Sequence, residues 1–376
     1  MKAAEKYIQN KLDERKQNGG YRSLKQESSL VDFCSNDYLG FARSRTLQDA
    51  VELEMRNRPN LNGATGSRLI SGNLAYTEDL EREIATLFSA DAGLLFNSGY
   101  DANLGLLSAL PQRGDTIIAD ELIHASLIDG ARLSHANRYT FKHNNLAALE
   151  SKLKNAKGLI YVVTESIFSM DGDSPDLVAM CDLCEQYQAN LIIDEAHAVG
   201  LYKTGIVSNL GLQHRVFARV ITFGKALGCH GAIILGSNLL RAYLINYARS
   251  FIYTTAAPFH QLATARCAFS LLQTASLQID ELHHRIKLFR KVIDLNANSN
   301  YALISSDSPI QCILLKSNDK AKLTATYLQN LCFDVRAIMS PTVAEGSERI
   351  RICLHAYNTP DEVTSLANEI NNLLHE

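Results

Sequence analysis

A lysine between two glycines follows one of the apolar segments of the chain. Lys225 lies in VITFGKALGCHGA, with Gly224 before it and Gly228 after it. Because glycines allow the backbone to approach closely, such a lysine can be partly desolvated, which lowers its pKa and exposes a neutral amine for Schiff-base chemistry. On spacing alone, a solvated loop lysine is the simpler interpretation.

The segment LIIDEAH places a carboxylate and an imidazole three residues apart. Asp194 ends an apolar run, and His197 follows it. A carboxylate at the end of a buried strand costs free energy unless it has a cationic partner, and a protonated pyridinium nitrogen is one such partner. The alternatives are a helix N-cap for Asp194 and a polar core histidine for His197. A helicase interpretation of DEAH fails, because the sequence contains no GxxxxGK[ST].

Two further segments combine a strand end with the start of a helix. SGY (98–100) has the glycine and the helix N-terminus that suit a phosphate, and Thr222 could add a hydroxyl. His124 begins a helix after DELI, where an imidazole could stack on a flat ring. The glycine-rich NGATGSRLISGN (62–73) lacks GxGxxG spacing, which argues against a nicotinamide fingerprint.

Arginines and cysteines supply weaker signals. Arg349 and Arg351 alternate along ERIRICLH and therefore share one face of a strand, from which an arginine could hold a carboxylate bidentately. An exposed strand face explains them equally well. Cys181 and Cys184 form a single CxxC within an apolar helical stripe, which favours core packing over a metal or redox role. We expect no bound metal.

Regular elements must position these residues. Apolar runs typical of buried strands alternate with segments of helical spacing, which predicts a mostly parallel sheet covered on both faces. Ligands of such sheets bind beyond the carboxyl ends of the strands, where the polar motifs fall. The expected strands are 93–99, 115–120, 138–143, 158–166, 191–197, 216–224 and 231–236. The expected helices are 2–17, 73–89, 101–110, 124–134, 146–155 and 175–188.

The length of 376 residues corresponds to roughly two domains at ~150 residues each. A long helical stretch (259–295), short strands (310–315, 333–338, 349–354) and a terminal helix (360–374) predict a smaller α+β part. We expect an N-terminal helix and connector over 1–45, a large cofactor-binding domain over 46–270 and a small domain over 271–376.

Composition excludes several classes of protein. Charged residues make up 20% and hydrophobic residues 46%, which argues against disorder. A net charge of −3 gives no electrostatic basis for binding nucleic acid or an anionic membrane. No apolar run is long enough to span a membrane, and the polar N-terminus does not resemble a secretory signal. We expect a cytoplasmic enzyme.

The order of the motifs is more specific than any one of them. SNDYLGF, GSRLISGN, FNSGYDANLG, DELIHASLIDGARLS, TESIFSMDGD, DEAHAVG, TFGKALGCHGA, FIYTTAAP and RIRICLHAYNT follow one another between about residues 20 and 370. Together they resemble the α-oxoamine synthases, which are fold-type I enzymes that use pyridoxal 5′-phosphate. This resemblance implies an α/β large domain with a mostly parallel seven-stranded sheet and a smaller C-terminal α+β domain.

The resemblance also assigns roles to single residues. Lys225 matches the Schiff-base lysine, Asp194 the partner of the pyridinium nitrogen, and His124 the residue stacked on the cofactor ring. The implied cofactor contacts are completed by His197 near the phenolic oxygen, Gly99, Tyr100, Ser169, Thr222 and Glu165, and by Thr255 toward the phosphate of a neighbouring subunit. The implied substrate contacts are Arg351, with Arg349 as second choice, Asn36 and Arg22. Ser166 and Thr65 depart from the family pattern, where glycine is usual.

Within this family the segments are most similar to the branch that serves biotin biosynthesis. That branch implies decarboxylative condensation of L-alanine with a pimeloyl thioester of CoA or an acyl carrier protein, in a homodimer with a shared active site. The alternatives are a sibling that uses glycine or serine (of the glycine C-acetyltransferase or serine palmitoyltransferase type), an aminotransferase, and a non-catalytic relative acting as a scaffold. The intact set of Lys225, Asp194, His197 and His124 argues against the last.

Overall fold

The computed structural model describes residues 2–26, 29–56, 62–294 and 301–375. The chain forms two compact units. The larger contains Asn36–Ser169 and Ser174–Asp280, and the smaller contains Met1–Ser35, Met170–Asp173 and Glu281–Glu376. The sequence-based domain limits at residues 45 and 270 stay a prediction. No helix in the described ranges is long and apolar enough to cross a bilayer.

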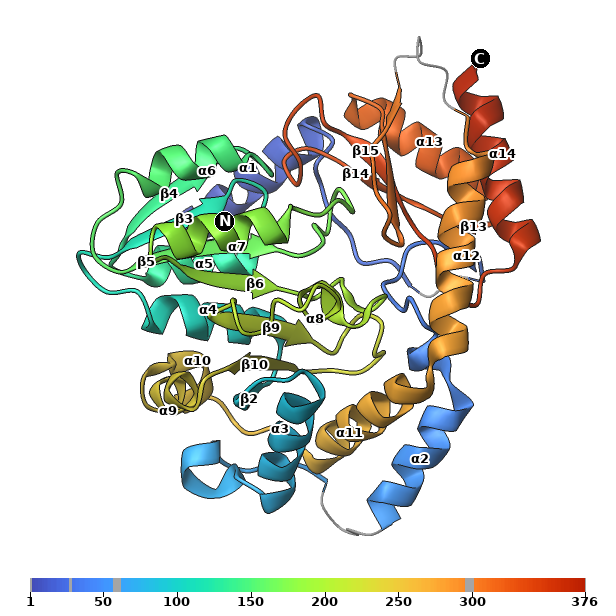
Figure 1. Cartoon of the computed structure of the whole chain (residues 1–376). Helices are drawn as coiled ribbons and strands as arrows, with labels where there is room; N and C mark the ends of the chain where they lie inside the picture. The colour runs from blue at the N-terminus through green and yellow to red at the C-terminus, as the bar shows by residue number, and fades with distance from the viewer. Residues whose placement is uncertain (1, 27–28, 57–61, 295–300, 376) are drawn as a thin grey trace. The chain divides into compact units, whose positions relative to one another are not determined.

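A seven-stranded sheet in the order β2-β10-β9-β6-β5-β3-β4 forms the centre of the larger unit (Figure 1). Its strands are β2 (Ala92–Phe96), β3 (Thr116–Asp120), β4 (Asn137–Phe141), β5 (Ile160–Glu165), β6 (Asn190–Asp194), β9 (Ala218–Thr222) and β10 (Ala232–Gly236). Within this sheet β10 is antiparallel to both neighbours, and the other pairs are parallel. The carboxyl ends of the parallel strands therefore meet at one edge.

Helices cover both faces of this sheet (Figure 1), as continuous runs of Val, Ile and Leu in buried strands require. The helices of the larger unit are α2 (Arg45–Arg56), α3 (Ala75–Leu87), α4 (Gly99–Ala109), α5 (Ala125–Leu133), α6 (Leu146–Leu153), α7 (Leu177–Gln186), α8 (Gly205–Asn209), α9 (Asn238–Tyr247), α10 (Arg249–Ile252) and α11 (Phe259–Thr274). Short elements complete the unit: η1 (Phe41–Arg43), η2 (Arg68–Gly72), β7 (Val199–Gly200) and β8 (Lys203–Thr204). On one face, Leu106 of α4 and Leu127 of α5 are fully buried in the core with strand residues.

A buried ion pair fixes the turn that follows β6. The carboxylate of Glu195 accepts hydrogen bonds from Arg219 Nε at 2.8 Å and from the Val207 amide at 3.0 Å. The guanidinium of Arg219 also donates to the Thr204 carbonyl and the Ser208 hydroxyl. Both charged side chains are almost fully buried. The pair thereby ties the β7–β8 hairpin and α8 to strands β6 and β9.

We predict that Glu195→Ala lowers the free energy of unfolding by about 3–5 kcal/mol, because it leaves the buried Arg219 guanidinium without its carboxylate. Chemical denaturation of the purified variant measures this change. The matched control is Asp49→Ala, which removes an exposed partner of Arg45 and should cost less than about 1 kcal/mol. Equal effects of the two substitutions would contradict the anchoring role of the buried pair.

The smaller unit is an α+β structure. Its four-stranded antiparallel sheet has the order β11-β12-β15-β14, and β1 pairs in parallel with β13. The strands are β1 (Val31–Asp32), β11 (Ala302–Leu303), β12 (Ile310–Leu314), β13 (Phe333–Asp334), β14 (Arg336–Ile338) and β15 (Arg349–Cys353). The helices are α1 (Ala3–Gln17), α13 (Asn318–Asn330), α14 (Pro360–His375) and most of α12 (Ser276–Val292).

The predicted fold class is confirmed, but two elements differ from the expectation. The helical stretch expected over 259–295 is two helices, α11 and α12, which are separated at Ala275. The last residue of the expected stretch, 295, lies outside the described ranges. The strand expected over 333–338 is split into β13 and β14, which belong to different sheets. Apolar periodicity does not reveal which sheet a strand joins, because pairing partners lie far away in the sequence.

Candidate active site

The last residues of four neighbouring strands in the larger sheet have acidic or hydroxyl side chains. Asp120, Glu165, Asp194 and Thr222 are the last residues of β3, β5, β6 and β9, and Glu165 is the register partner of Asp194. Because these strands run in the same direction, all four residues lie at one edge of the sheet. This is the edge at which the sequence predicts the site.

Asp194 is held by two hydrogen bonds at the end of β6. Its Oδ2 accepts from Asn103 Nδ2 at 2.7 Å, and its Oδ1 accepts from the Ala196 amide at 2.9 Å. Burial raises the pKa of Asp194, while these bonds and electrostatic interactions with His124 and Lys225 act against that rise. A raised pKa means that the ionised carboxylate is costly in the folded protein. A cation bound beside Asp194 would relieve this cost.

His124 and Glu165 form a second pair at this edge. The His124 amide donates to Glu165 Oε1 at 2.6 Å, and the Ser169 amide also donates to Glu165. Burial, together with the charges of Asp194 and Asp120, raises the pKa of Glu165 well above its usual value. Burial lowers the pKa of His124, which favours a neutral imidazole. The Ser126 amide donates to His124 Nδ1 at 3.2 Å and fixes the ring as the N-cap of α5.

Lys225 and His197 lie on short turns after β9 and β6. Lys225 is half-buried, and its carbonyl accepts the Gly228 amide at 2.9 Å. Gly228 has a φ of +61°, and a Cβ there would lie 2.2 Å from the Ala42 nitrogen, so this turn requires glycine. His197 is 5% exposed, and its Nδ1 lies 2.7 Å from the Tyr38 hydroxyl.

The N-terminus of α4 faces the end of β9. A Cβ on Gly99 would lie 2.4 Å from Thr222 Cγ2, so the two backbones approach closely. Thr222 Oγ1 is buried and has no hydrogen-bond partner among the described residues. Ser98 caps the helix by accepting the Asp101 amide, and the amides of Gly99 and Tyr100 belong to the first turn, which has no intrahelical acceptors. The site therefore offers a hydroxyl and a helix N-terminus to an anion.

Three further predicted residues, Tyr100, Asn36 and Ser166, make contacts around this group. Tyr100 is 44% exposed, and its hydroxyl donates to Asp129 of α5, which raises the pKa of Tyr100. Asn36 accepts the Tyr38 hydroxyl at 3.1 Å. Ser166, one of the two departures from the family pattern, is buried and donates its amide to the Asp194 carbonyl at 2.9 Å.

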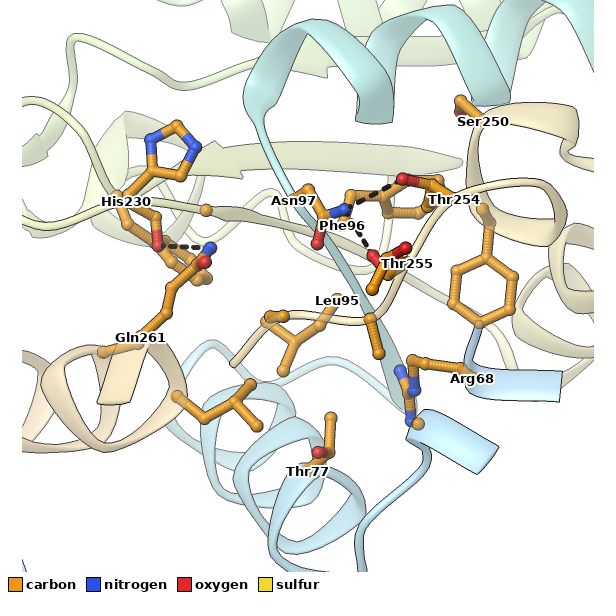
Figure 2. Close-up of a pocket in the computed structure, with 18 residues that line it drawn as sticks. Arg68, Thr77, Leu95, Phe96, Asn97, His230, Ser250, Thr254, Thr255 and Gln261 are labelled. Carbon is orange, nitrogen blue, oxygen red and sulfur yellow. Dashed lines mark hydrogen bonds between the residues drawn. The ribbon is translucent and has the colours of Figure 1, made fainter. Parts of the chain in front are cut away.

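Thr255 lines a separate pocket of the larger unit (Figure 2). Asn97 Nδ2 donates to Thr254 Oγ1 at 3.1 Å and to the Thr255 carbonyl at 2.9 Å. Arg68 also lines this pocket, and neither Lys225 nor Asp194 is among its described lining residues. The predicted contact of Thr255 with a phosphate in a neighbouring subunit stays a prediction.

The predicted arginines belong to the smaller unit. Arg349 and Arg351 on β15 are 5% and 8% exposed, so the exposed-face alternative does not hold. Arg349 Nη1 forms an ion pair with Asp171 at 2.5 Å, whereas Arg351 Nη1 contacts Cys353 Sγ at 2.9 Å. Arg22 donates to Thr342 Oγ1 at 2.8 Å. Their roles in binding substrate stay predictions.

Three polar residues of the site escape sequence reasoning: Asn103, Ser126 and Tyr38. Asn103 is 1% exposed and bridges Asp194 and the Ser126 hydroxyl. The weak signal in the sequence is that Asn103 lies four residues after Gly99, on the same side of α4. Tyr38 is the tyrosine of SNDYLG, which sequence reasoning associated with a turn.

Cys181 and Cys184 are buried on α7, where burial raises their pKa to about 11 and about 12.

Comparisons with known proteins match nearly the whole chain. Residues 28–370 match the family described as aminotransferase class I and II. The 8-amino-7-oxononanoate synthase of Emericella nidulans is 41% identical over 91% of this chain and 89% of its own. A putative 8-amino-7-oxononanoate synthase of Bacillus licheniformis is 37% identical over 96% of this chain and 95% of its own.

Solved structures show the same fold. A serine palmitoyltransferase variant from S. paucimobilis, with bound PLP and myriocin, has a TM-score of 0.89, 21% identity and coverage of 99% of this chain and 98% of its own. The 8-amino-7-oxononanoate synthase of Francisella tularensis has a TM-score of 0.75, 27% identity and coverage of 92% and 99%. The chain thus belongs to the aminotransferase class I and II family and, within it, to the α-oxoamine synthases. It is a pyridoxal-phosphate-dependent acyltransferase.

The described site fits pyridoxal 5′-phosphate. The unpartnered Thr222 hydroxyl and the N-terminus of α4 suit the phosphate. Asp194, whose burial opposes its ionisation, suits a protonated ring nitrogen. Lys225 lies on the turn after β9, close enough for its charge to act on both Asp194 and His124. Each of these matches rests on a side chain or a helix terminus of this chain.

We predict that Gly99→Ala weakens binding of pyridoxal phosphate by at least about tenfold (~1.4 kcal/mol). The added methyl group must displace Thr222, and overpacking of this kind typically costs about 1–3 kcal/mol. Absorbance titration of the cofactor-free protein measures the dissociation constant. Gly63→Ala is the control, because nothing lies within 4 Å of its added Cβ. Unchanged affinity in Gly99→Ala would contradict the phosphate assignment.

Proposed function

We propose that this chain is an 8-amino-7-oxononanoate synthase of biotin biosynthesis. It condenses L-alanine with a pimeloyl thioester and releases 8-amino-7-oxononanoate, CO₂ and the free thiol. The observation that carries the proposal is the similarity over about nine-tenths of the chain to relatives of that name, at up to 41% identity. The arrangement of Lys225, Asp194 and His124 at one sheet edge supplies the matching chemistry.

Pyridoxal phosphate, when bound, withdraws electrons from the α-carbon of an attached amino acid and so supports both the loss of its proton and the loss of CO₂. In the proposed arrangement Lys225 binds the cofactor, Asp194 holds a proton on its ring nitrogen, and His124 stacks on the ring. Thr222, Gly99 and the first turn of α4 hold the phosphate.

Lys225 also moves the proton in this proposal. With L-alanine bound, the free amine of Lys225 would take the proton from the alanine Cα, and this carbon would then bond to the thioester carbonyl as the C–S bond breaks and the thiol leaves. Proton transfer by a positioned side chain is typically worth ~10²–10⁴ in rate. The position of Lys225 supports this role, because it is half-buried on the turn after β9 and acts electrostatically on Asp194 and His124.

Glu165 and Ser169 support the His124 side of the site in this proposal. The carboxyl group of Glu165 receives the amides of both His124 and Ser169, and this fixes the start of α5 against the end of β5. For the substrate, we propose that Arg351 holds the carboxylate of the amino acid, with Arg349 as the second choice. Arg22 is proposed to meet the acyl donor.

The proposed partners follow the same assignment. The acyl donor is pimeloyl-CoA or a pimeloyl acyl carrier protein, and the enzyme is a homodimer in which Thr255 reaches the phosphate bound by the neighbouring subunit. We propose that it acts in the cytoplasm. Polar groups gather around Thr255, as Figure 2 shows, and this supports a polar contact at that position.

Competition between amino acids tests the proposal. Purified enzyme saturated with pyridoxal phosphate is given pimeloyl-CoA and either L-alanine, glycine or L-serine, and thiol release is followed. We expect kcat/KM for L-alanine to exceed the other two by at least about tenfold, a difference of ~1.4 kcal/mol in transition-state binding. A preference for glycine or serine would move the chain to a sibling activity. No thiol release with any amino acid or thioester would indicate a non-catalytic relative.

A further inference from the structure

One side-chain amide joins two polar groups at the carboxyl edge of the larger sheet. Asn103 lies on α4 and is 1% exposed, and its Nδ2 donates to Asp194 Oδ2 at 2.7 Å and to the Ser126 hydroxyl at 3.0 Å. The Ser126 hydroxyl in turn lies 2.8 Å from His124 Nδ1. A continuous set of hydrogen bonds therefore runs from Asp194 to His124.

The orientation of the Asn103 amide follows from the charge of its neighbour. With the amide reversed, its oxygen would lie 2.7 Å from an oxygen of Asp194, which is repulsive when that carboxyl group is ionised. The donor orientation leaves Asn103 Oδ1 buried and without a hydrogen-bond partner among the described residues. An unsatisfied buried acceptor lowers stability, and a cost of this kind is typical of functional sites.

The backbone at the start of α5 determines where the imidazole proton lies. The Ser126 amide donates to His124 Nδ1 at 3.2 Å, and a backbone N–H can only donate. Nδ1 is therefore an acceptor. The hydroxyl proton of Ser126 also points toward it, because the hydroxyl oxygen already accepts from Asn103. The proton of the neutral ring then lies on Nε2, and a second proton on Nδ1 would oppose the Ser126 amide.

The charges that face this ring act in both directions. Burial has the largest effect on the pKa of His124 and lowers it, as does Lys225 on the turn after β9. Asp194 on β6 and Asp129 on α5 raise this pKa. Glu165 on β5 accepts the backbone amide of His124 at 2.6 Å. The positive end of the α5 dipole acts in the same direction as burial, so the net effect agrees with a neutral imidazole.

We propose that Asn103 is a positioning residue, which holds Asp194 in its ionised form with one amide proton. Its second amide proton fixes the Ser126 hydroxyl as a donor to His124, and this keeps the imidazole as the neutral Nε2–H tautomer. Asn103 acts on the reaction through these neighbours. The proposal rests on the proposed function in one respect, namely that Asp194 meets the ring nitrogen of pyridoxal phosphate.

NMR of the cofactor-free protein tests the bond to Asp194. With ¹³C-labelled aspartate, the Asp194 carboxyl group is assigned by its loss in Asp194→Asn. We expect Asp194 to bind a proton at least about tenfold more tightly in Asn103→Leu than in the wild type, the effect of one lost hydrogen bond to a charged group. Unchanged titration of Asp194 in Asn103→Leu would overturn the proposal.

The bond to Ser126 is tested with ¹⁵N-labelled histidine, whose His124 resonances are assigned by their loss in His124→Gln. We expect the proton of the neutral ring on Nε2 in the wild type. The ring should bind a second proton about fivefold more tightly in Ser126→Ala, which lacks the hydroxyl, and more tightly also in Asn103→Leu, which no longer directs it. A proton on Nδ1 in the wild type, or unaltered titration of His124 in both variants, would overturn the proposal.

The matched control is Asn190→Leu. Asn190 begins β6, at the opposite end of that strand from Asp194, and its amide donates to the Ile160 carbonyl at 3.1 Å. This variant should leave the titration of Asp194 and His124 unchanged. Equal shifts in Asn190→Leu and Asn103→Leu would indicate a general loss of packing and overturn the proposal. Should Asn103→Leu fail to fold, Asn103→Ala removes the same donors without adding bulk and is measured in its place.

Protein loaded with pyridoxal phosphate that carries ¹⁵N in its ring separates the two proposals. We expect a protonated ring nitrogen in the wild type and a shift toward the unprotonated form in Asn103→Leu. If the titration of Asp194 shifts but the ring nitrogen does not, the role of Asn103 stands and the proposed contact of Asp194 with the ring is wrong. If L-alanine is turned over as proposed but neither Asp194 nor His124 changes its titration, the role of Asn103 is wrong.

Discussion

Lys225→Ala should lower turnover by at least about 10³-fold while leaving the fold intact. The substitution removes the amine that binds the cofactor and moves the Cα proton, and positioned proton transfer alone is worth ~10²–10⁴. The change is made on a turn whose geometry depends on Gly228 and Ala42, not on the lysine side chain. Cofactor should also be lost on dialysis, since its covalent attachment is gone.

Thiol release and the visible spectrum after dialysis measure this effect. Circular dichroism and the thermal midpoint show whether the fold is kept. Lys157→Ala is the matched control: Lys157 is exposed and lies before β5, at the opposite end of that strand from Glu165. Turnover of Lys225→Ala within about tenfold of the wild type (~1.4 kcal/mol) would rule out Lys225 as the catalytic amine.

Asp194→Asn should lower kcat by about 10²–10³-fold, in line with the removal of one preorganised electrostatic partner. The carboxylate lies between donors from Asn103 and Ala196, so the neutral amide keeps the shape of the site but removes its negative charge. A bound ring nitrogen would then lose the group that keeps it protonated. Some binding of the cofactor should survive, because the phosphate site is unchanged.

The expected signature is a loss in kcat that is larger than the loss in affinity for pyridoxal phosphate. Steady-state kinetics and absorbance titration separate the two. Asp182→Asn on α7 is the control, because it replaces an exposed carboxylate that pairs with Arg215. Unaltered kcat in Asp194→Asn would remove Asp194 from the mechanism.

The position of the site could be predicted from the sequence because it follows from strand direction. Asp194 and Lys225 come directly after apolar runs, and parallel strands bring such positions to one edge. The structure places Glu165 and Asp194 as register partners and lets Lys225 and His124 act on the charge of Asp194. Strand ends alone left simpler interpretations open for Lys225 and Asp194, and their roles were predicted from the order of the motifs.

The supporting contacts could not be predicted, because they join distant segments. Asn103 reaches Asp194 across 91 positions, and Tyr38 reaches His197 across 159. Helical or strand periodicity indicates which face of an element is buried, but not which polar group on another element lies opposite. The pairing of Arg349 with Asp171, across 178 positions, was hidden for the same reason.

The central claim is the joining of L-alanine to a pimeloyl thioester with loss of the alanine carboxyl group. The most direct measurement uses L-alanine labelled with ¹³C in that carboxyl group, purified wild-type enzyme and pimeloyl-CoA, and follows labelled CO₂ and the amino-ketone product by mass spectrometry. We predict one labelled CO₂ for each free thiol, an unlabelled product of the mass of 8-amino-7-oxononanoate, and neither without the thioester. Product that retains the label, or labelled CO₂ released without thioester, would contradict it.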